Sequence, residues 1–227
     1  MSSNRALSPI LRSIKAYMEF EKESGVEELF ASQPISGSTA SPKASTAAQE
    51  LESLKREVLR CRACDLSNTR LNVVFGAGNP NAGLMFVGEA PGSEEDIQGL
   101  PFVGRAGQLL TKIIEAMGLR REDVYITNVL KCRPPNNRAP LPDEIAACRE
   151  TLRRQIAIIK PKVICTLGKF ASQTLLNTET TISRLRGNFY EYEGIKVMPT
   201  FHPAYLLRNP HDKKLAWADM KKIKKLL

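Results

Sequence analysis

Residues 84–92 read LMFVGEAPG, and this stretch decides the expected fold. A short apolar run that ends in glycines is typical of a strand buried on both faces and followed by a tight turn. Similar apolar runs occur at residues 124–131, 163–168 and 196–202, and each precedes a segment with apolar residues at helical spacing. Four such strand–helix units predict an α/β fold: a three-layer α/β/α sandwich with a central four-stranded, mostly parallel sheet.

Residues suited to a binding site lie at or near the end of each predicted strand. They are Glu89, Asn128, Gly168 and His202. Ligands of open parallel sheets sit beyond the carboxyl ends of the strands, so these distant residues are expected to share one cleft. Phe102 lies among glycines in GLPFVGRAG (99–107), where small neighbours offer its ring little local packing. We therefore expect Phe102 to be a flat stacking surface and not a core residue.

Four of the five cysteines form a split pattern. Cys61 and Cys64 have the C-x-x-C spacing that lets two thiolates hold one inorganic centre, and Cys132 and Cys148 follow about seventy residues later. The pattern predicts an iron–sulfur cluster or a zinc ion, and spacing does not choose between them. A disulfide framework and a redox C-x-x-C are less favoured interpretations. Cys165, inside an apolar strand, is expected in the core.

Charge and composition point to a nucleic-acid partner. The chain has 33 basic and 24 acidic residues, a formal net charge of +9 and an isoelectric point near 9.4. Such an excess favours polyanions, nucleic acid first. No apolar run approaches the roughly twenty residues of a membrane helix, and the first residues lack a signal-peptide pattern. We expect a soluble, cytoplasmic protein that has no membrane partner and acts as a monomer.

Three parts are expected along the chain: an N-terminal helical arm (1–31), a flexible linker (32–47) rich in Ser, Ala and Pro, and a folded body (48–227). An apolar stripe runs along the arm at helical spacing, from Leu7 to Met18. This N-terminal helical extension either docks a protein partner or packs back onto the body.

Five segments together identify a family. GEAPG (88–92), PFVGRAG (101–107), NVLKCRPPNNR (128–138), PDEIAAC (142–148) and FHPAYLLR (201–208) occur in this order with fitting spacing. They resemble the family 4 uracil-DNA glycosylases, the iron–sulfur-containing branch of that superfamily, over residues 48–227. The resemblance implies a glycosylase-like catalytic domain in this range. It also implies a [4Fe–4S] cluster held by Cys61, Cys64, Cys132 and Cys148 in a structural role.

The implied reaction is hydrolysis of the N-glycosidic bond between uracil and deoxyribose, after the nucleotide has flipped out of the DNA helix. By the same resemblance, Phe102 stacks on uracil and Asn128 hydrogen-bonds its N3–H and O4. His202 donates to O2, where negative charge develops on the leaving base. Backbone groups of Glu89 and Ala90 line the O2 side of the pocket.

Water activation is the least determined step. Glycosylases of another family have an aspartate where this chain has Ala90, so the general base must differ here. Glu95 or Glu89 is expected to orient the water, and Glu95 is the preferred candidate. Some relatives capture the sugar covalently through a histidine in the loop after the third cysteine. That loop contains no histidine here, so turnover is expected.

The DNA itself is expected to contact further residues. Leu206, Leu207 and Arg208 fill the gap left by the flipped base, although either leucine can instead pack under the C-terminal helix. The expected phosphate contacts are Arg105, Lys131, Arg133 and Arg138. Two alternatives remain open: a catalytically weak iron–sulfur module that recognises uracil-DNA without turnover, and a zinc-stapled partner module.

Overall fold

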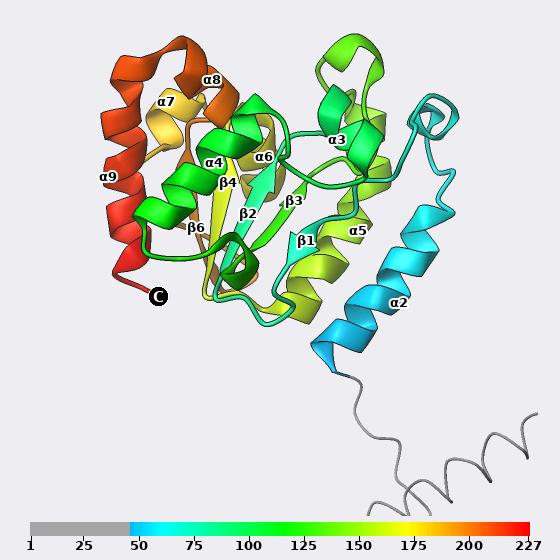
Figure 1. The fold of residues 1–227 in the computed structure, drawn as a ribbon, viewed down its shortest axis with the longest axis horizontal. Helices are drawn as coiled ribbons and strands as arrows, with labels where there is room; N and C mark the ends of the chain where they lie inside the picture. The colour runs from blue at the N-terminus through cyan, green and yellow to red at the C-terminus, as the bar shows by residue number, and fades with distance from the viewer. Residues whose placement is uncertain (1–45) are drawn as a thin grey trace, which may run out of the picture. The chain divides into compact units, whose positions relative to one another are not determined.

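A six-stranded sheet runs through the centre of residues 46–227, the part of the chain that the structure, a computed structural model, describes (Figure 1). The strand order is β1-β3-β2-β4-β6-β5. The strands are β1 (Ala77–Gly78), β2 (Leu84–Gly88), β3 (Tyr125–Asn128), β4 (Val163–Leu167), β5 (Tyr190–Tyr192) and β6 (Ile195–Thr200). The predicted helical arm and all but the last two residues of the predicted linker lie outside the described residues.

The four central strands are parallel, which confirms the predicted α/β fold with a mostly parallel sheet. The prediction of four strands in total is wrong, because two short antiparallel strands, β1 and β5, cover the edges. Neither carries an apolar run that would reveal it. β1 is two residues long, and β5 is a Tyr-Glu-Tyr segment that a Glu-Gly turn joins to β6.

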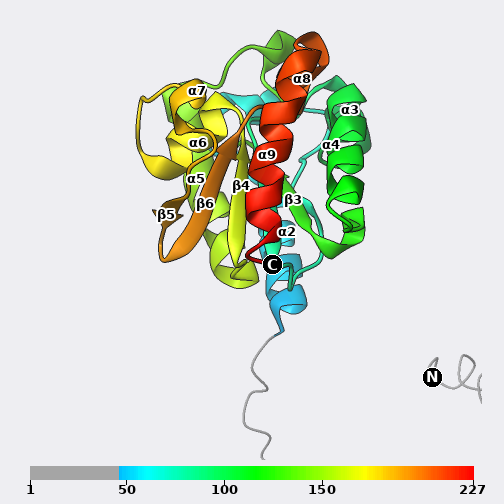
Figure 2. The ribbon, with the colours of Figure 1, turned by 90° about the vertical axis from the view of Figure 1, so that its left-hand side faces the viewer.

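Helices cover both faces of the sheet, as Figures 1 and 2 show. The helices are α2 (Ala47–Leu59), α3 (Ser93–Gln98), α4 (Arg105–Ala116), α5 (Pro142–Ile159), α6 (Lys169–Leu176), α7 (Ile182–Leu185), α8 (Pro203–Arg208) and α9 (Lys213–Lys224). Side chains from α4 and α9 pack on one face, and those from α2, α5 and α6 pack on the other. None of the described helices combines the length and the apolarity that a membrane crossing requires.

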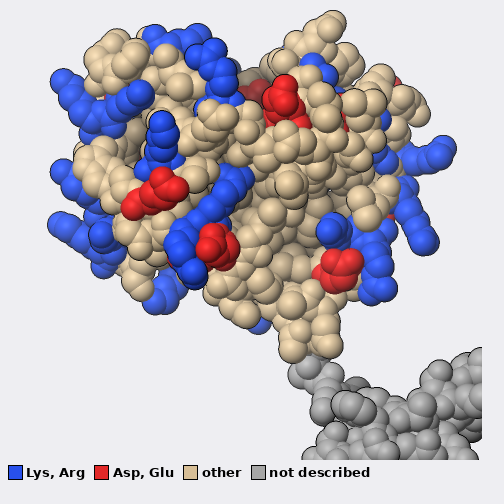
Figure 3. Space-filling model, viewed as in Figure 1, with Lys and Arg blue, Asp and Glu red and all other residues tan. Residues whose placement is uncertain are grey.

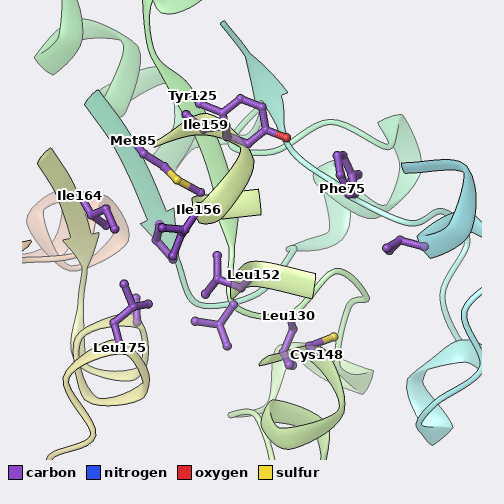
Figure 4. Packing of buried hydrophobic residues seen from close by; sticks show 14 of the residues in the cluster. Phe75, Met85, Tyr125, Leu130, Cys148, Leu152, Ile156, Ile159, Ile164 and Leu175 are labelled. Atoms are coloured by element: carbon purple, nitrogen blue, oxygen red, sulfur yellow. The ribbon is translucent and has the colours of Figure 1, made fainter. Parts of the chain in front are cut away.

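Strand β2 shows how the sequence produces two cores. Successive side chains of a strand point to opposite faces. Leu84 and Phe86 therefore join the cluster under α4 and α9, whereas Met85 and Val87 join the cluster under α2 and α5. All four are buried, as the continuously apolar run predicted. In Figure 4, Cys148 lies with Leu130 and Leu152 at one end of the cluster under α2 and α5.

A buried ion pair fixes the end of β6, from which the chain enters the site. Asp219 of α9 is fully buried and pairs with the Arg186 guanidinium, whose Nε donates to Asp219 Oδ2 over 3.1 Å. Thr200 Oγ1 donates to the same carboxylate over 2.7 Å. Buried charges require such partners. The contacts tie α9 to the last residue of β6, two positions before His202.

Candidate active site

A cleft of about 510 Å³ lies at the carboxyl edge of the sheet. Residues that follow three different strands line it: Glu89 and Ala90 after β2, Asn128 at the end of β3, and His202 after β6. Phe102, from the loop before α4, completes this set. The structure thus brings all five predicted uracil-binding residues to one cleft. Gly168, after β4, is not among the lining residues but lies beside His202, since a Cβ added at Gly168 would fall 3.0 Å from the Cβ of His202.

The floor of the cleft depends on Gly88, the last residue of β2. A Cβ at Gly88 would fall 2.3 Å from Asn128 Oδ1 and 2.5 Å from Phe102 Cζ, so no side chain fits there. The amide and the ring therefore meet above bare backbone. Asn128 is buried, and its Oδ1 has no hydrogen-bond partner among the described residues. A ligand that donates a hydrogen bond would satisfy this oxygen.

Phe102 sits in a conformation that its sequence context explains. Its φ of 52° is uncommon for a residue with a side chain. The backbone of Phe102 presses against α4 at Gly107, where a Cβ would fall 1.9 Å from the Phe102 carbonyl oxygen. The expectation that Phe102 is not a core residue is wrong. Its ring is buried and belongs to the cluster under α4. It fits there because Gly88 and Gly107, which contact Phe102, have no side chains.

His202 is the N-cap of α8, and this fixes its tautomer. Its Nδ1 accepts a hydrogen bond from the backbone N–H of Ala204 over 3.1 Å. A neutral ring with Nδ1 as acceptor carries its hydrogen on Nε2. Burial lowers the pKa of His202 to about 4, and the nearby charge of Arg208 contributes to this shift. The ring is tilted 32° to that of Phe102, with centroids 5.7 Å apart.

The two candidate carboxylates differ in their surroundings. Glu95 Oε1 accepts from the backbone N–H groups of Val103 and Gly104, and its Oε2 accepts from that of Gly92. Glu95 therefore ties the GEAPG turn to the loop that carries Phe102. This engagement argues against the sequence prediction that Glu95, in preference to Glu89, orients the water. Glu89 has no such bonds among the described residues. Burial raises the pKa of its carboxyl, and Lys169 partly opposes this shift.

The predicted DNA contacts divide into surface and core residues. Arg138 and Arg208 line the cleft, and Arg105 is exposed at the start of α4. Arg133 and Leu207 are partly exposed. Leu206 is wrong as a DNA contact, because it is buried with Phe201 and Ala216 in the alternative packing under the C-terminal helix.

The prediction that Lys131 contacts a phosphate is also wrong. Its side chain is 1% exposed, and its Nζ donates to Thr127 Oγ1 over 2.7 Å and to the Asn128 carbonyl oxygen over 2.5 Å. Burial lowers the pKa of Lys131 to about 7, although the neighbouring cysteines raise it. The basic motif around this residue misled the prediction, because the tertiary fold turns its lysine inward and its arginines outward.

The four predicted metal ligands surround one cavity on the α5 side of the sheet. Cys61, Cys64, Cys132 and Cys148 line it together with Arg70, and Arg70 Nη1 donates to Cys132 Sγ over 3.1 Å. Within residues 46–227, no three His, Cys, Asp or Glu side chains are placed to hold a single ion. Four cysteines around a shared cavity are nevertheless a donor set that a zinc ion or an iron–sulfur cluster takes.

Burial also sets the protonation of these thiols. It raises the pKa of Cys132 to about 11, although the hydrogen bond and charge of Arg70 lower it. Burial raises the pKa of Cys148 as well. Metal ligation requires thiolates, so binding of a metal here would release protons. Cys165 is fully buried in β4, as predicted for a core residue.

Sequence reasoning missed three contributors. Gly88 stood in a quoted motif, but its contact with Asn128 joins two strands and has no local signal. Arg70 is a single arginine outside every motif, and only the fold places it beside Cys132. Tyr205 lines the cleft from the first turn of α8. Its position three residues after the N-cap His202 is the one signal that could have identified it.

Known proteins match this chain closely. A sequence model of the uracil DNA glycosylase superfamily matches residues 75–221. The type-4 uracil-DNA glycosylase of Archaeoglobus fulgidus is 50% identical over 78% of this chain and 94% of that protein. The type-4 enzymes of Thermotoga maritima and Sulfurisphaera tokodaii are each 49% identical over 78% of this chain, and over 94% and 84% of those proteins. The chain therefore belongs to the uracil-DNA glycosylase superfamily and, within it, to the type-4 uracil-DNA glycosylases.

Proposed function

We propose that this chain is a DNA-repair hydrolase that cleaves the N-glycosidic bond of uracil in DNA and leaves an abasic site. Membership of the type-4 family supports the reaction. The observation that carries the proposal is the buried, unpartnered Oδ1 of Asn128 beside the ring of Phe102 within the described residues. An unpaired buried acceptor costs about 1–3 kcal/mol, which a ligand that donates to it recovers on binding.

Uracil fits this acceptor. A base that stacks on Phe102 places its edge against the Asn128 amide, where Oδ1 accepts from N3–H and Nδ2 donates to O4. Cytosine has an acceptor at N3 and a donor at its exocyclic amine. In the same position it would leave the amide oxygen facing a lone pair, and a buried site rejects such a mismatch strongly.

His202 supplies the donor for the leaving base. Because the Ala204 N–H occupies Nδ1, the Nε2–H of a neutral ring is the group available to the cleft. As the bond breaks, negative charge develops on uracil, and a fixed donor at O2 stabilises it. The low pKa of His202 keeps the ring neutral at pH 7, so it acts as a hydrogen-bond donor and does not transfer a full proton.

We assign water orientation to Glu89. Its carboxylate lines the cleft and remains available, whereas Glu95 is engaged by three backbone N–H groups. Burial raises the basicity of Glu89, which favours a role in drawing a proton from water as it attacks the sugar. Glu95 then acts indirectly, by holding the loop that carries Phe102.

The DNA strand would cross the mouth of the cleft. Arg208 lies on its lining, where a cation can meet phosphate, and Arg138 lies there too with its guanidinium paired to the Glu144 carboxylate. Leu207, partly exposed on α8, is the apolar residue placed to enter the gap left by the flipped base. Lys and Arg dominate both flanks of the face in Figure 3, in keeping with the net charge of +9.

We further propose that Cys61, Cys64, Cys132 and Cys148 hold a [4Fe–4S] cluster. Such a cluster would supply cross-linking: it would join the segment after α2, the segment after β3 and helix α5 at one point. Arg70 would offset part of the negative charge of the four thiolates. Three further statements remain predictions. They are that the N-terminal arm binds a protein partner, that a flexible linker follows it, and that the protein acts on cellular DNA as a monomer.

The reaction is tested with a single-stranded and a double-stranded oligonucleotide that each contain one uracil, followed by alkali. We expect strand scission by the wild-type chain. Asn128→Ala should reduce the single-turnover rate about 100-fold or more, since the uracil edge loses both partners. No scission of either substrate by wild type would refute the proposed activity.

The tautomer and pKa of His202 can be measured by ¹⁵N NMR. The chain has two histidines, so in the His211→Gln variant His202 is the only histidine that gives a signal. We expect hydrogen on Nε2 at pH 7 and titration near pH 4. The unfolded chain, with a pKa near 6.5, then binds more protons than the folded chain between pH 6.5 and 4. His202 should therefore stabilise the fold above pH 6.5 and lose this contribution as pH falls to 4; titration near 6.5 would contradict the assignment.

The roles of the two carboxylates are separated by Glu89→Gln and Glu95→Gln. Loss of a water-orienting group typically costs about 10²–10⁴ in rate, so Glu89→Gln should slow single-turnover cleavage by about this factor. Glu95→Gln keeps an acceptor for Val103 and Gly104 and should be the milder change, with a weaker affinity for uracil. If Glu95→Gln instead slowed cleavage more than Glu89→Gln, Glu95 would be the water-orienting residue.

The cluster is tested on protein purified without oxygen. We expect about four iron and four sulfide per chain. Cys132→Ala should lower both contents and the melting temperature, because three segments lose a shared anchor, whereas Cys165→Ala should retain the metal. Zinc without sulfide in the wild type would exclude the iron–sulfur assignment.

A further inference from the structure

Lys131 contacts both sites at once. Lys131 lines the cavity of the four cysteines and directly precedes Cys132 in the chain. Its Nζ reaches the other way and donates to the carbonyl oxygen of Asn128 over 2.5 Å. A single residue therefore joins the cysteine site to the residue that faces uracil.

The bond to Asn128 acts on a peptide group with few other restraints. Asn128 is the last residue of β3, where the ladder with β2 ends at Gly88. The following N–H, of Val129, donates to the Gly88 carbonyl over 2.9 Å. The Asn128 carbonyl on the same peptide group points away and is held by Lys131. Together these bonds fix the peptide plane, and with it the direction in which the Asn128 side chain leaves the backbone.

The other contacts of Lys131 hold its side chain rigidly. Thr127 Oγ1 accepts from Nζ over 2.7 Å and itself donates to the Phe75 carbonyl over 2.9 Å. Gln155 donates to the same carbonyl over 2.8 Å. Every member of this network is buried, so its bonds do not exchange with water.

We propose that Lys131 is a positioning residue that couples the cysteine site to uracil recognition by setting the orientation of Asn128. The coupling rests on the uracil excision and the cluster proposed above. Filling the cysteine site fixes Cys132, and the peptide bond between the two residues then holds the backbone of Lys131. Its side chain transmits that position to the Asn128 peptide group, so the cluster serves the uracil pocket as well as the fold.

The test is a double-mutant cycle between Lys131→Met, which keeps the apolar stem and loses both Nζ bonds, and Asn128→Ala. We expect Lys131→Met to slow single-turnover cleavage about 10- to 100-fold. Because Lys131 acts through Asn128, the double variant should cleave no more than about twofold slower than Asn128→Ala alone. Inhibition by free uracil should weaken, whereas affinity for abasic DNA should stay within about twofold of wild type.

Matched variants keep the test decisive. Lys162→Met removes an exposed lysine that bonds to the Leu227 carbonyl, and it should leave every measurement unchanged. If Lys131→Met loses iron or fails to fold, Thr127→Val replaces it in the cycle. This variant removes one acceptor of the ammonium and should slow cleavage about threefold, again without adding to Asn128→Ala.

The outcomes separate this inference from the proposed reaction. If wild type does not cleave uracil-DNA, both are refuted. If wild type cleaves and the Lys131 variant matches it within about twofold, only the coupling is refuted. Losses that add fully in the double variant, or equal weakening of free uracil and abasic DNA, also refute the coupling, because they indicate a general structural defect.

Discussion

The absence of a side chain at Gly88 is the constraint on which the rest of the site depends. Parallel strands bring their carboxyl ends to one edge, but β2 and β3 are adjacent, and any Cβ at Gly88 would occupy the space of the Asn128 amide. Only bare backbone lets the amide and the ring of Phe102 meet. The ring reaches this position through a left-handed backbone that a second glycine, Gly107, admits. Two glycines thus create a pocket with an aromatic wall and an amide at its edge.

Polar contacts then set the chemical state of each group. The helix that follows His202 uses Nδ1 as its cap, which leaves a donor at Nε2, and burial keeps the ring neutral. Glu95 uses its oxygens to accept from backbone N–H groups and makes two loops into one rigid wall. Glu89, close by in sequence and without such bonds among the described residues, keeps its basicity. The two carboxylates of this short segment therefore differ in their hydrogen bonds, because only Glu95 has backbone donors within reach.

The cysteine site and the cleft share the segment from Asn128 to Cys132. Asn128 faces the cleft, and Cys132 lines the cysteine cavity. Between them, the buried Lys131 donates a hydrogen bond from Nζ to the Asn128 carbonyl oxygen. A buried ammonium is stable where acceptors and negative groups surround it. Thiolates formed on metal loading would supply such charge beside Lys131. The arrangement would give the cysteines a direct physical route to the pocket, in addition to their proposed role as an anchor for three segments.

The sequence by itself determined the α/β class, the four central strands and the helices that cover them, because apolar periodicity reports burial locally. Its motifs also named the family and the five predicted uracil-binding residues that line the cleft. The sequence did not reveal strands β1 and β5, which are too short or too polar to form a pattern. Nor did it distinguish Lys131 and Leu206 from their exposed neighbours in basic or apolar motifs. The burial of these two residues, the tautomer of His202 and the different hydrogen bonds of Glu89 and Glu95 depend on contacts between distant segments or on local backbone geometry. Only the tertiary structure decides these.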